Sequence, residues 1–143
     1  MIKDISVQYE RLPKKLDNSN TYLFISVGGN DLLEIYKYGN MEVDNHEPLD
    51  FIFELYKKEV NKLRKKTNCT IVLTDLYYVT DPEYKKFYPL IKKWNKNLHS
   101  FSKEKNIEVY KISNLVKTPS HFTNSIEPSS IGSRIIVDNI INF

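Results

Sequence analysis

The sequence predicts an α/β fold in which a parallel sheet carries helices on both of its faces. Three observations predict it: short apolar runs that lack polar alternation, longer segments with helical spacing, and the regular alternation of the two along the chain. Strands that alternate with helices of this length are typical of right-handed βαβ units. Residues 1–143 contain no linker, repeat or low-complexity segment, so we expect a single domain.

The first predicted strand is Thr21–Val27, a run rich in aromatic and β-branched residues. Two glycines and the pair Asn30-Asp31 follow it at once, which is typical of a buried strand that ends in a tight loop. An amphipathic helix is predicted from Glu47 to Lys66, because apolar residues recur there at every third or fourth position. Those residues are Leu49, Ile52, Phe53, Tyr56, Val60 and Leu63.

The second half of the chain continues the same alternation. Cys69–Asp75 is predicted to be a strand that is covered on both faces, since it shows no polar alternation. Apolar spacing predicts a second long helix over Phe87–Phe101, and Ile107–Ile112 is the third predicted strand. Ser129 or Ser130 can cap a last helix with isoleucines on one side.

Composition and charge exclude several classes of function. Lys and Arg outnumber Asp and Glu by 21 to 18, and the basic run Lys57–Lys66 is interrupted by apolar residues at helical spacing. We interpret it as a solvated helix face and expect no nucleic-acid partner.

The single cysteine, Cys69, excludes an internal disulfide and fits a reducing compartment, so we expect a cytoplasmic protein. No apolar run reaches membrane-spanning length, and no residue spacing indicates a metal or cofactor.

Three segments carry a resemblance to the SGNH/GDSL hydrolases, a family of esterases and lipases. Phe24–Asp31 resembles the family block in which an Asn helps to form the oxyanion hole, and Trp94–Leu98 lies where the family has an Asn-containing helix. Asn124–Gly132 resembles the block that usually reads Asp-x-x-His-Pro-Ser, followed by Gly. The resemblance implies a three-layer, flavodoxin-like parallel sheet across nearly the whole chain. Taken alone, Gly-Gly-Asn-Asp also suits a turn and a helix cap.

The resemblance also supplies the candidate site residues. Asn30 matches the oxyanion-hole Asn, while Asn124 and Glu127 occupy the positions of the family Asp and His. His121 lies close by in sequence and is a possible base, although it also suits a loop histidine without a partner. A carboxylate such as Glu127 is a weaker base toward a serine hydroxyl than histidine is.

The chain departs from the family pattern at its start. The Gly-Asp-Ser block with the nucleophilic serine is not found, nor is the second block that supplies a glycine amide, and Ile5–Leu16 resembles the helix that follows that block. We therefore expect a partial SGNH hydrolase-like domain that lacks the first strands of the family. Thr21–Val27 would then be an apolar sheet edge, which favours a homodimer, an N-terminal partner fragment, or cover from residues 1–20.

Three functional hypotheses remain open at this point. The first is a catalytically inactive pseudoenzyme that acts as a structural or binding module, because the nucleophile block is missing. The second is a serine esterase or acyl hydrolase that an N-terminal segment or a partner chain completes. The third is a protein that binds a small ester ligand, without chemistry, in the cleft that corresponds to the active site of the family. Asn30, Tyr77, Tyr78 and Glu127 would then surround the ligand.

Overall fold

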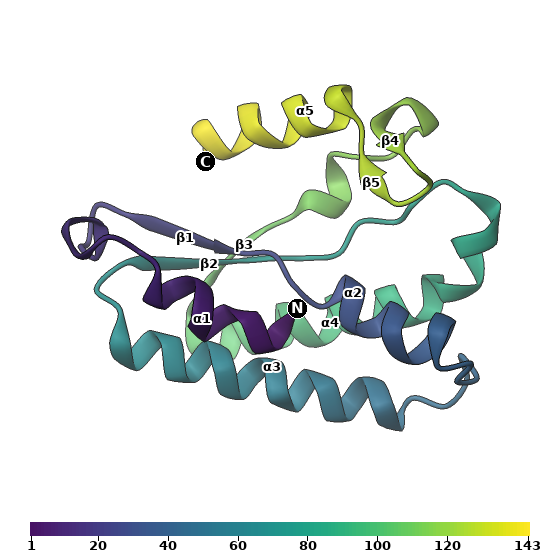
Figure 1. The fold of residues 1–143 in the computed structure, drawn as a ribbon, viewed down its shortest axis with the longest axis horizontal. Helices are drawn as coiled ribbons and strands as arrows, with labels where there is room; N and C mark the ends of the chain where they lie inside the picture. The colour runs from purple at the N-terminus through teal and green to yellow at the C-terminus, as the bar shows by residue number, and fades with distance from the viewer.

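A computed structural model describes residues 1–143, and its centre is a sheet of three parallel strands (Figure 1). Their order in the sheet is β1-β2-β3, so β2 lies in the middle and β1 forms one edge. Leu23 pairs with Ile71 across the first ladder. The strands are β1 (Tyr22–Ile25), β2 (Thr70–Thr74) and β3 (Glu108–Tyr110). The predicted parallel α/β fold is therefore confirmed, with strands somewhat shorter than expected.

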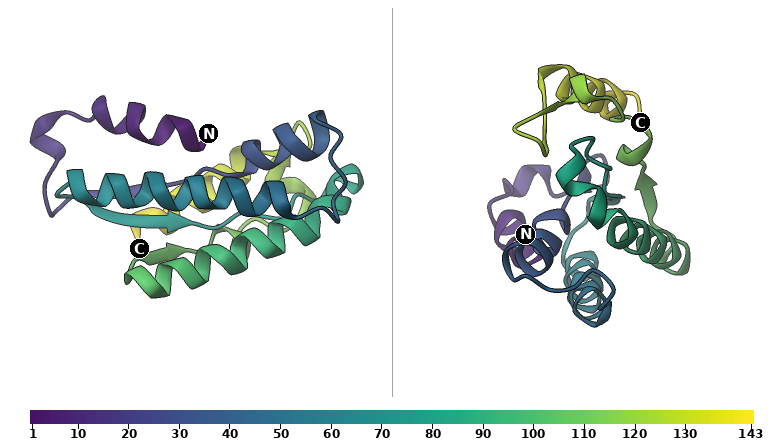
Figure 2. Two further views of the ribbon diagram at one scale, coloured as in Figure 1. Left: turned by 90° about the horizontal axis from the view of Figure 1, so that it is seen from below. Right: turned by 90° about the vertical axis from the view of Figure 1, so that its right-hand side faces the viewer.

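Helices cover both faces of the sheet, but unequally (Figure 1). The earlier helices lie on one side of the sheet, and the right-hand view of Figure 2 shows the last helix alone on the opposite side. The helices are α1 (Ile5–Glu10), α2 (Gly29–Leu33), α3 (Glu47–Lys66), α4 (Tyr88–Lys105) and α5 (Ser130–Ile141). We call the face under α1, α3 and α4 the first face and the face under α5 the second face. None of the helices combines the length and the hydropathy that crossing a bilayer requires.

Strand β2 shows why the chain folds in layers. Successive side chains of a strand point to opposite faces, so Ile71 and Leu73 join the core of the first face while Val72 joins that of the second. All three are buried. The absence of polar alternation in this segment is thus explained, as predicted, by a central strand that is covered on both sides.

The core of the first face is built around aromatic side chains. Trp94 of α4 and Tyr56 of α3 have no exposed surface, and their ring centroids lie 5.4 Å apart. Phe53 meets the Trp94 ring edge-to-face at 5.0 Å, an arrangement that aromatic pairs prefer. These contacts fix α3 and α4 against each other and against the sheet.

The core of the second face is smaller. Val72, Tyr110, Ile112 and Val116 form it, and α5 contributes partly buried isoleucines. The Tyr110 hydroxyl donates a hydrogen bond of 2.8 Å to the carbonyl of Ile136, which ties β3 to α5.

Two segments of the structure differ from what the sequence predicts. The helix expected over Ile5–Leu16 is wrong in its second half, because α1 ends at Glu10 and only a 3₁₀ turn follows at Lys14–Leu16. Pro13 lies between them, and proline cannot donate the hydrogen bond that a continuing helix needs. The hairpin of β4 (Phe122–Thr123) and β5 (Glu127–Pro128) was not predicted.

The long helix and the last helix match the prediction closely. Helix α3 spans Glu47–Lys66 as expected. Ser129 caps α5, since its Oγ accepts a hydrogen bond of 3.2 Å from the amide of Gly132.

Candidate functional site

Gly28 sets the geometry of the loop that follows β1. Its φ of 114° lies in the region that favours glycine, and a Cβ there would collide with the ring of Trp94. The chain can therefore turn sharply over the indole and enter α2 within one residue. Its carbonyl accepts the first helical hydrogen bond, 3.0 Å from the amide of Leu32.

The two polar residues of this loop have different roles. Asn30 is exposed and lines a pocket, whereas Asp31 is only 9% exposed and its carboxylate accepts hydrogen bonds of 3.2 and 3.3 Å from the amide of Ile2. Asp31 therefore holds the N-terminal segment against α2. Asn30 remains available to donate a hydrogen bond to a ligand.

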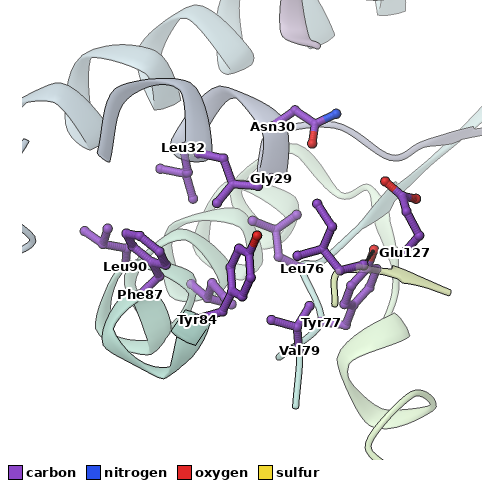
Figure 3. Close-up of a pocket in the computed structure, with 13 residues that line it drawn as sticks. Gly29, Asn30, Leu32, Leu76, Tyr77, Val79, Tyr84, Phe87, Leu90 and Glu127 are labelled. Carbon is purple, nitrogen blue, oxygen red and sulfur yellow. Dashed lines mark hydrogen bonds between the residues drawn. The ribbon is translucent and has the colours of Figure 1, made fainter. Parts of the chain in front are cut away.

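The pocket beside Asn30 is apolar and small. Its volume is about 100 Å³, and 10 of its 13 lining residues are hydrophobic. Figure 3 shows Asn30 and Glu127 toward one side of it, with apolar side chains such as Leu32, Phe87 and Leu90 toward the other. The pocket can therefore hold an apolar group whose polar end meets Asn30 and Glu127.

The hairpin β4–β5 supplies the wall opposite α2. Asn124, Ser125 and Ile126 form its three-residue loop, and Asn124 and Ser125 reverse the chain there with φ values of 47° and 69°. Glu127 lies on the returning strand and lines the pocket, but Asn124 is exposed at the turn and does not. The structure thus brings Asn30 and Glu127 to one pocket and leaves Asn124 outside it.

Tyr77 connects this hairpin to the loop after β2. Its hydroxyl donates a hydrogen bond of 2.9 Å to the carbonyl of Ile126. Burial, together with the nearby Glu127 carboxylate, raises the pKa of Tyr77 to about 12. Tyr77 lines the pocket as the sequence suggested, while Tyr78 lines a separate polar pocket.

His121 does not reach the apolar pocket. Its Nδ1 accepts a hydrogen bond of 3.1 Å from the amide of Lys117, and its carbonyl accepts one of 2.8 Å from the amide of Ser129. Gly132 packs directly on that carbonyl, where a Cβ would collide with it. His121 therefore joins the hairpin to the start of α5.

Asn95 positions the floor of the pocket, a role that sequence reasoning missed. Its amide oxygen accepts from the Leu76 amide at 2.8 Å, and its amide nitrogen donates to the Leu76 carbonyl at 2.7 Å. This pair of bonds clamps the loop after β2 to α4. The resemblance placed an Asn-containing helix here, but no local pattern indicates the contact.

The residues that line the pocket include no serine, cysteine, threonine or histidine. The two serines weighed as nucleophiles lie elsewhere: Ser26 lines a groove beside β1, and Ser125 lies in the exposed hairpin loop. No group of three or more His, Cys, Asp or Glu side chains is placed to hold a metal ion. The hydroxyls of Tyr77 and Tyr84 also line the pocket, but they are hydrogen-bonded to the Ile126 carbonyl and to Lys37. The pocket therefore has a hydrogen-bond donor in Asn30 and a carboxylate in Glu127, but no serine, threonine or cysteine nucleophile.

Solved structures with this arrangement of strands, helices and loops include two bacterial hydrolases. A GDSL-like lipase from Parabacteroides merdae is 20% identical with a TM-score of 0.68, and a catalytic mutant of Axe2, an acetylxylan esterase from Geobacillus stearothermophilus, is 15% identical with a TM-score of 0.72. The chain has the fold of GDSL-like hydrolases. The CTD of the Drosophila Oskar protein is also similar, with 17% identity and a TM-score of 0.64.

These matches cover nearly all of this chain but only part of each similar structure. Each of the three comparisons covers 99% of this chain, but 66% of the lipase and of Axe2 and 68% of the Oskar structure. The chain thus spans about two thirds of the length of the two hydrolases. No family model and no curated sequence matches it. The expected SGNH/GDSL-type fold is confirmed.

Proposed function

We propose that this chain is a binding module for short acyl groups and does not itself hydrolyse esters. The observation that carries the proposal is an apolar pocket with the Asn30 amide at its rim and no nucleophile in its lining. Such a pocket can recognise an acyl group and its carbonyl without cleaving the bond between acyl and alcohol.

The size of the pocket favours a short acyl chain. A cavity of about 150 Å³ can hold a benzene molecule, so the volume of about 100 Å³ suits an acyl group of roughly two to four carbons. Leu32, Phe87 and Leu90 would contact this chain, and the Asn30 amide would donate to the carbonyl oxygen. Two proteins of similar structure are a lipase and an acetylxylan esterase, which supports an ester as the ligand.

Glu127 is the only charged residue that lines the pocket, and no serine or threonine hydroxyl is present there for it to activate. Ester hydrolysis by a serine route needs a nucleophile, a base and several donors at the developing oxyanion. Losing one such donor costs about a hundredfold to a thousandfold in turnover, and losing the nucleophile costs far more. We therefore expect ester binding without turnover.

Thermal unfolding in the presence of methyl butyrate and methyl decanoate tests the binding. We expect methyl butyrate to raise the melting temperature and to be recovered intact, while methyl decanoate at the same concentration has no effect. In the same samples, a fluorophosphonate probe should label no residue. Labelling of the purified chain, or release of butyrate, would contradict the inactive module; the lack of any shift would contradict the acyl pocket.

The variant Asn30→Ala tests whether the Asn30 side chain at the rim of the pocket contributes to ester binding. The side chain is exposed and makes no hydrogen bond within the chain, so the variant should fold normally. Loss of one hydrogen bond to the carbonyl, about 1 kcal/mol, should weaken methyl butyrate about fivefold. Asn20→Ala is the matched control, because Asn20 is exposed, lies outside the pocket lining and likewise makes no side-chain hydrogen bond; it should leave the affinity unchanged.

A second candidate function is an esterase that another strand completes, and the open edge of the sheet favours it. The Thr21 carbonyl bonds to the Thr70 amide of β2, so by alternation the backbone groups of Tyr22 and Phe24 point to the open side. A groove of about 360 Å³ separates this edge from α1, and 9 of its 11 lining residues are hydrophobic.

A parallel strand in this groove would place its carboxyl end near Gly28 and Asn30, because the carboxyl ends of parallel strands meet at one side of a sheet. The resemblance implies that such a strand carries Gly-Asp-Ser. A synthetic strand ending in this block should make the mixture reactive toward fluorophosphonate and slow hydrogen exchange at Tyr22 and Phe24. Protection of these amides in the chain alone, without added strand, would contradict the idea.

A further inference from the structure

A second pocket lies at the carboxyl ends of β2 and β3, on the side of α4. It has a volume of about 410 Å³, within the usual range for small-ligand sites, and only one of its nine lining residues is hydrophobic. The residues that matter are Asp75, Ser113, Lys92, Lys96, His99 and Lys103. Asn95 also lines it, and its bonds to Leu76 separate it from the acyl pocket. The two sites therefore share one wall.

Asp75 forms the floor of this pocket. It is 3% exposed, and its carboxylate accepts hydrogen bonds from the Ser113 amide at 2.9 Å and the Ser113 hydroxyl at 2.6 Å. The Nε2 of His99 lies 3.4 Å from the same carboxylate. The negative charge of Asp75 is thus already compensated by hydrogen bonds within the protein, and other charged residues lie at the opening of the pocket.

This cluster is not a hydrolytic triad. A serine nucleophile needs a base in hydrogen-bond contact with its hydroxyl, and the base in turn needs an orienting carboxylate. Here Ser113 and His99 both contact Asp75, and no hydrogen bond joins His99 to Ser113. The arrangement therefore fixes the imidazole ring in place and does not activate the serine.

Positive charge dominates the helix wall of the pocket. Lys92, Lys96, His99 and Lys103 are spaced by four, three and four residues, so they form one stripe along α4. None of the three lysines is within ion-pair distance of a carboxylate, although Lys93 and Lys105 of the same helix do form ion pairs. Three unpaired ammonium groups therefore border a single polar pocket.

We infer that this pocket binds a small ligand that carries phosphate. Lysine ammonium groups bind phosphate as point charges, and three of them outnumber the single, already bonded carboxylate. Tyr78 lines the same pocket and offers an aromatic surface to the organic part of a phosphate ester. The inference does not depend on the proposed acyl function.

Calorimetric titration of the full chain with inorganic pyrophosphate at low salt tests the site. We expect saturable binding of one pyrophosphate per chain, weakened as the salt concentration rises. Replacing Lys92, Lys96 and Lys103 by alanine together should weaken pyrophosphate binding roughly 20-fold. Each exposed charge pair contributes up to about fivefold to the affinity. The absence of saturable binding in the unmodified chain would overturn the inference.

A matched triple variant separates a site from general electrostatic attraction. Lys58, Lys65 and Lys66 are exposed on α3, form no ion pair and do not line the pocket, so replacing them by alanine removes the same charge from outside the site. This variant should bind pyrophosphate within twofold of the unmodified chain. An equal loss in both triple variants would overturn the inference, because net charge alone would then explain the binding.

Two further titrations identify the source of the phosphate. If phenyl phosphate binds more tightly than inorganic phosphate, and Tyr78→Ala removes the difference, the pocket accepts a phosphate ester. Equal affinities that depend on the α4 lysines would support free phosphate as the ligand. Asn30→Ala should change neither affinity, so a failure of the acyl pocket is distinguishable from a failure of this one.

Discussion

The first and second faces of the sheet differ in how completely helices cover them. On the first face, Trp94 and Tyr56 are fully buried between α3, α4 and the sheet. On the second face, α5 has a single buried residue, Gly132, and Ile131 and Val137 on the same helix are about half exposed. The difference indicates that the first face provides most of the stability, since buried apolar area dominates folding free energy.

The acyl pocket draws one wall from each of these regions. Leu32, Phe87 and Leu90 belong to the large core of the first face, whereas Glu127 and Ile126 come from the hairpin that precedes α5. The hairpin strands are two residues long, so few backbone bonds hold them. The fold thus combines a rigid apolar wall with a less strongly anchored polar wall.

Truncating one side chain on each face should show the largest contrast. Trp94→Ala should lower the free energy of unfolding by about 3–5 kcal/mol, because it opens a large cavity among aromatic rings. Ile140→Ala, on the partly buried side of α5, should cost about 1 kcal/mol. Urea unfolding measures both. Comparable losses would contradict the view that the first face carries the stability.

Gly28→Ala should produce the next largest effect. The positive φ costs about 1–2 kcal/mol for alanine, and overpacking against Trp94 adds about 1–3 kcal/mol. Trp94→Phe leaves more room, so the double variant should lose less than the sum of the two single losses. Strict additivity in the cycle would show that the ring does not meet the new methyl group.

The sequence predicted the elements whose side-chain pattern reports burial directly. Helix α3 follows from its apolar spacing, and β2 follows from its unbroken apolar run. The hairpin was missed because two-residue strands carry no periodicity, although Asn124 at its turn is a turn-forming residue. The prediction for the last motif was incomplete for the same reason. Asn124 and Glu127 were expected to act together, but only Glu127 lines the pocket.

The site residues that sequence reasoning missed act across long separations. Asn95 bonds to Leu76, and Trp94 lies under Gly28, 66 positions earlier in the chain. A single sequence contains no local signal for such contacts, because they depend on how α4 packs against the loops. Asn30, which the resemblance singled out from a motif local to one turn, lines the pocket.

Two tyrosines, one from each region, give a matched pair of smaller effects. The Tyr56 hydroxyl is buried in the first face without a hydrogen-bond partner, so Tyr56→Phe should be neutral or stabilise the chain by up to about 1 kcal/mol. Tyr77→Phe removes the bond to the Ile126 carbonyl and should cost about 1 kcal/mol. Hydrogen exchange should quicken in the hairpin only in Tyr77→Phe. Quickening across α3 in that variant would contradict a local role.

The smallest effect is expected in the dependence of stability on alkaline pH. Burial and the Glu127 carboxylate raise the pKa of Tyr77 to about 12, whereas an unfolded tyrosine has a pKa of about 10. The folded chain therefore keeps this proton longer than the unfolded chain, so its contribution is complete below pH of about 10 and is lost as the pH rises toward about 12.

Tyr77→Phe should consequently make the alkaline fall in the free energy of unfolding shallower, and Glu127→Gln should do so to a lesser degree, because its charge is the smaller of the two causes. Urea unfolding at intervals between about pH 9 and 12 measures the slope. If the slope is the same in Tyr77→Phe and the unmodified chain, Tyr77 is as accessible to solvent as in the unfolded chain. The hairpin would then be open in solution, and the polar wall of the acyl pocket would form only when a ligand binds.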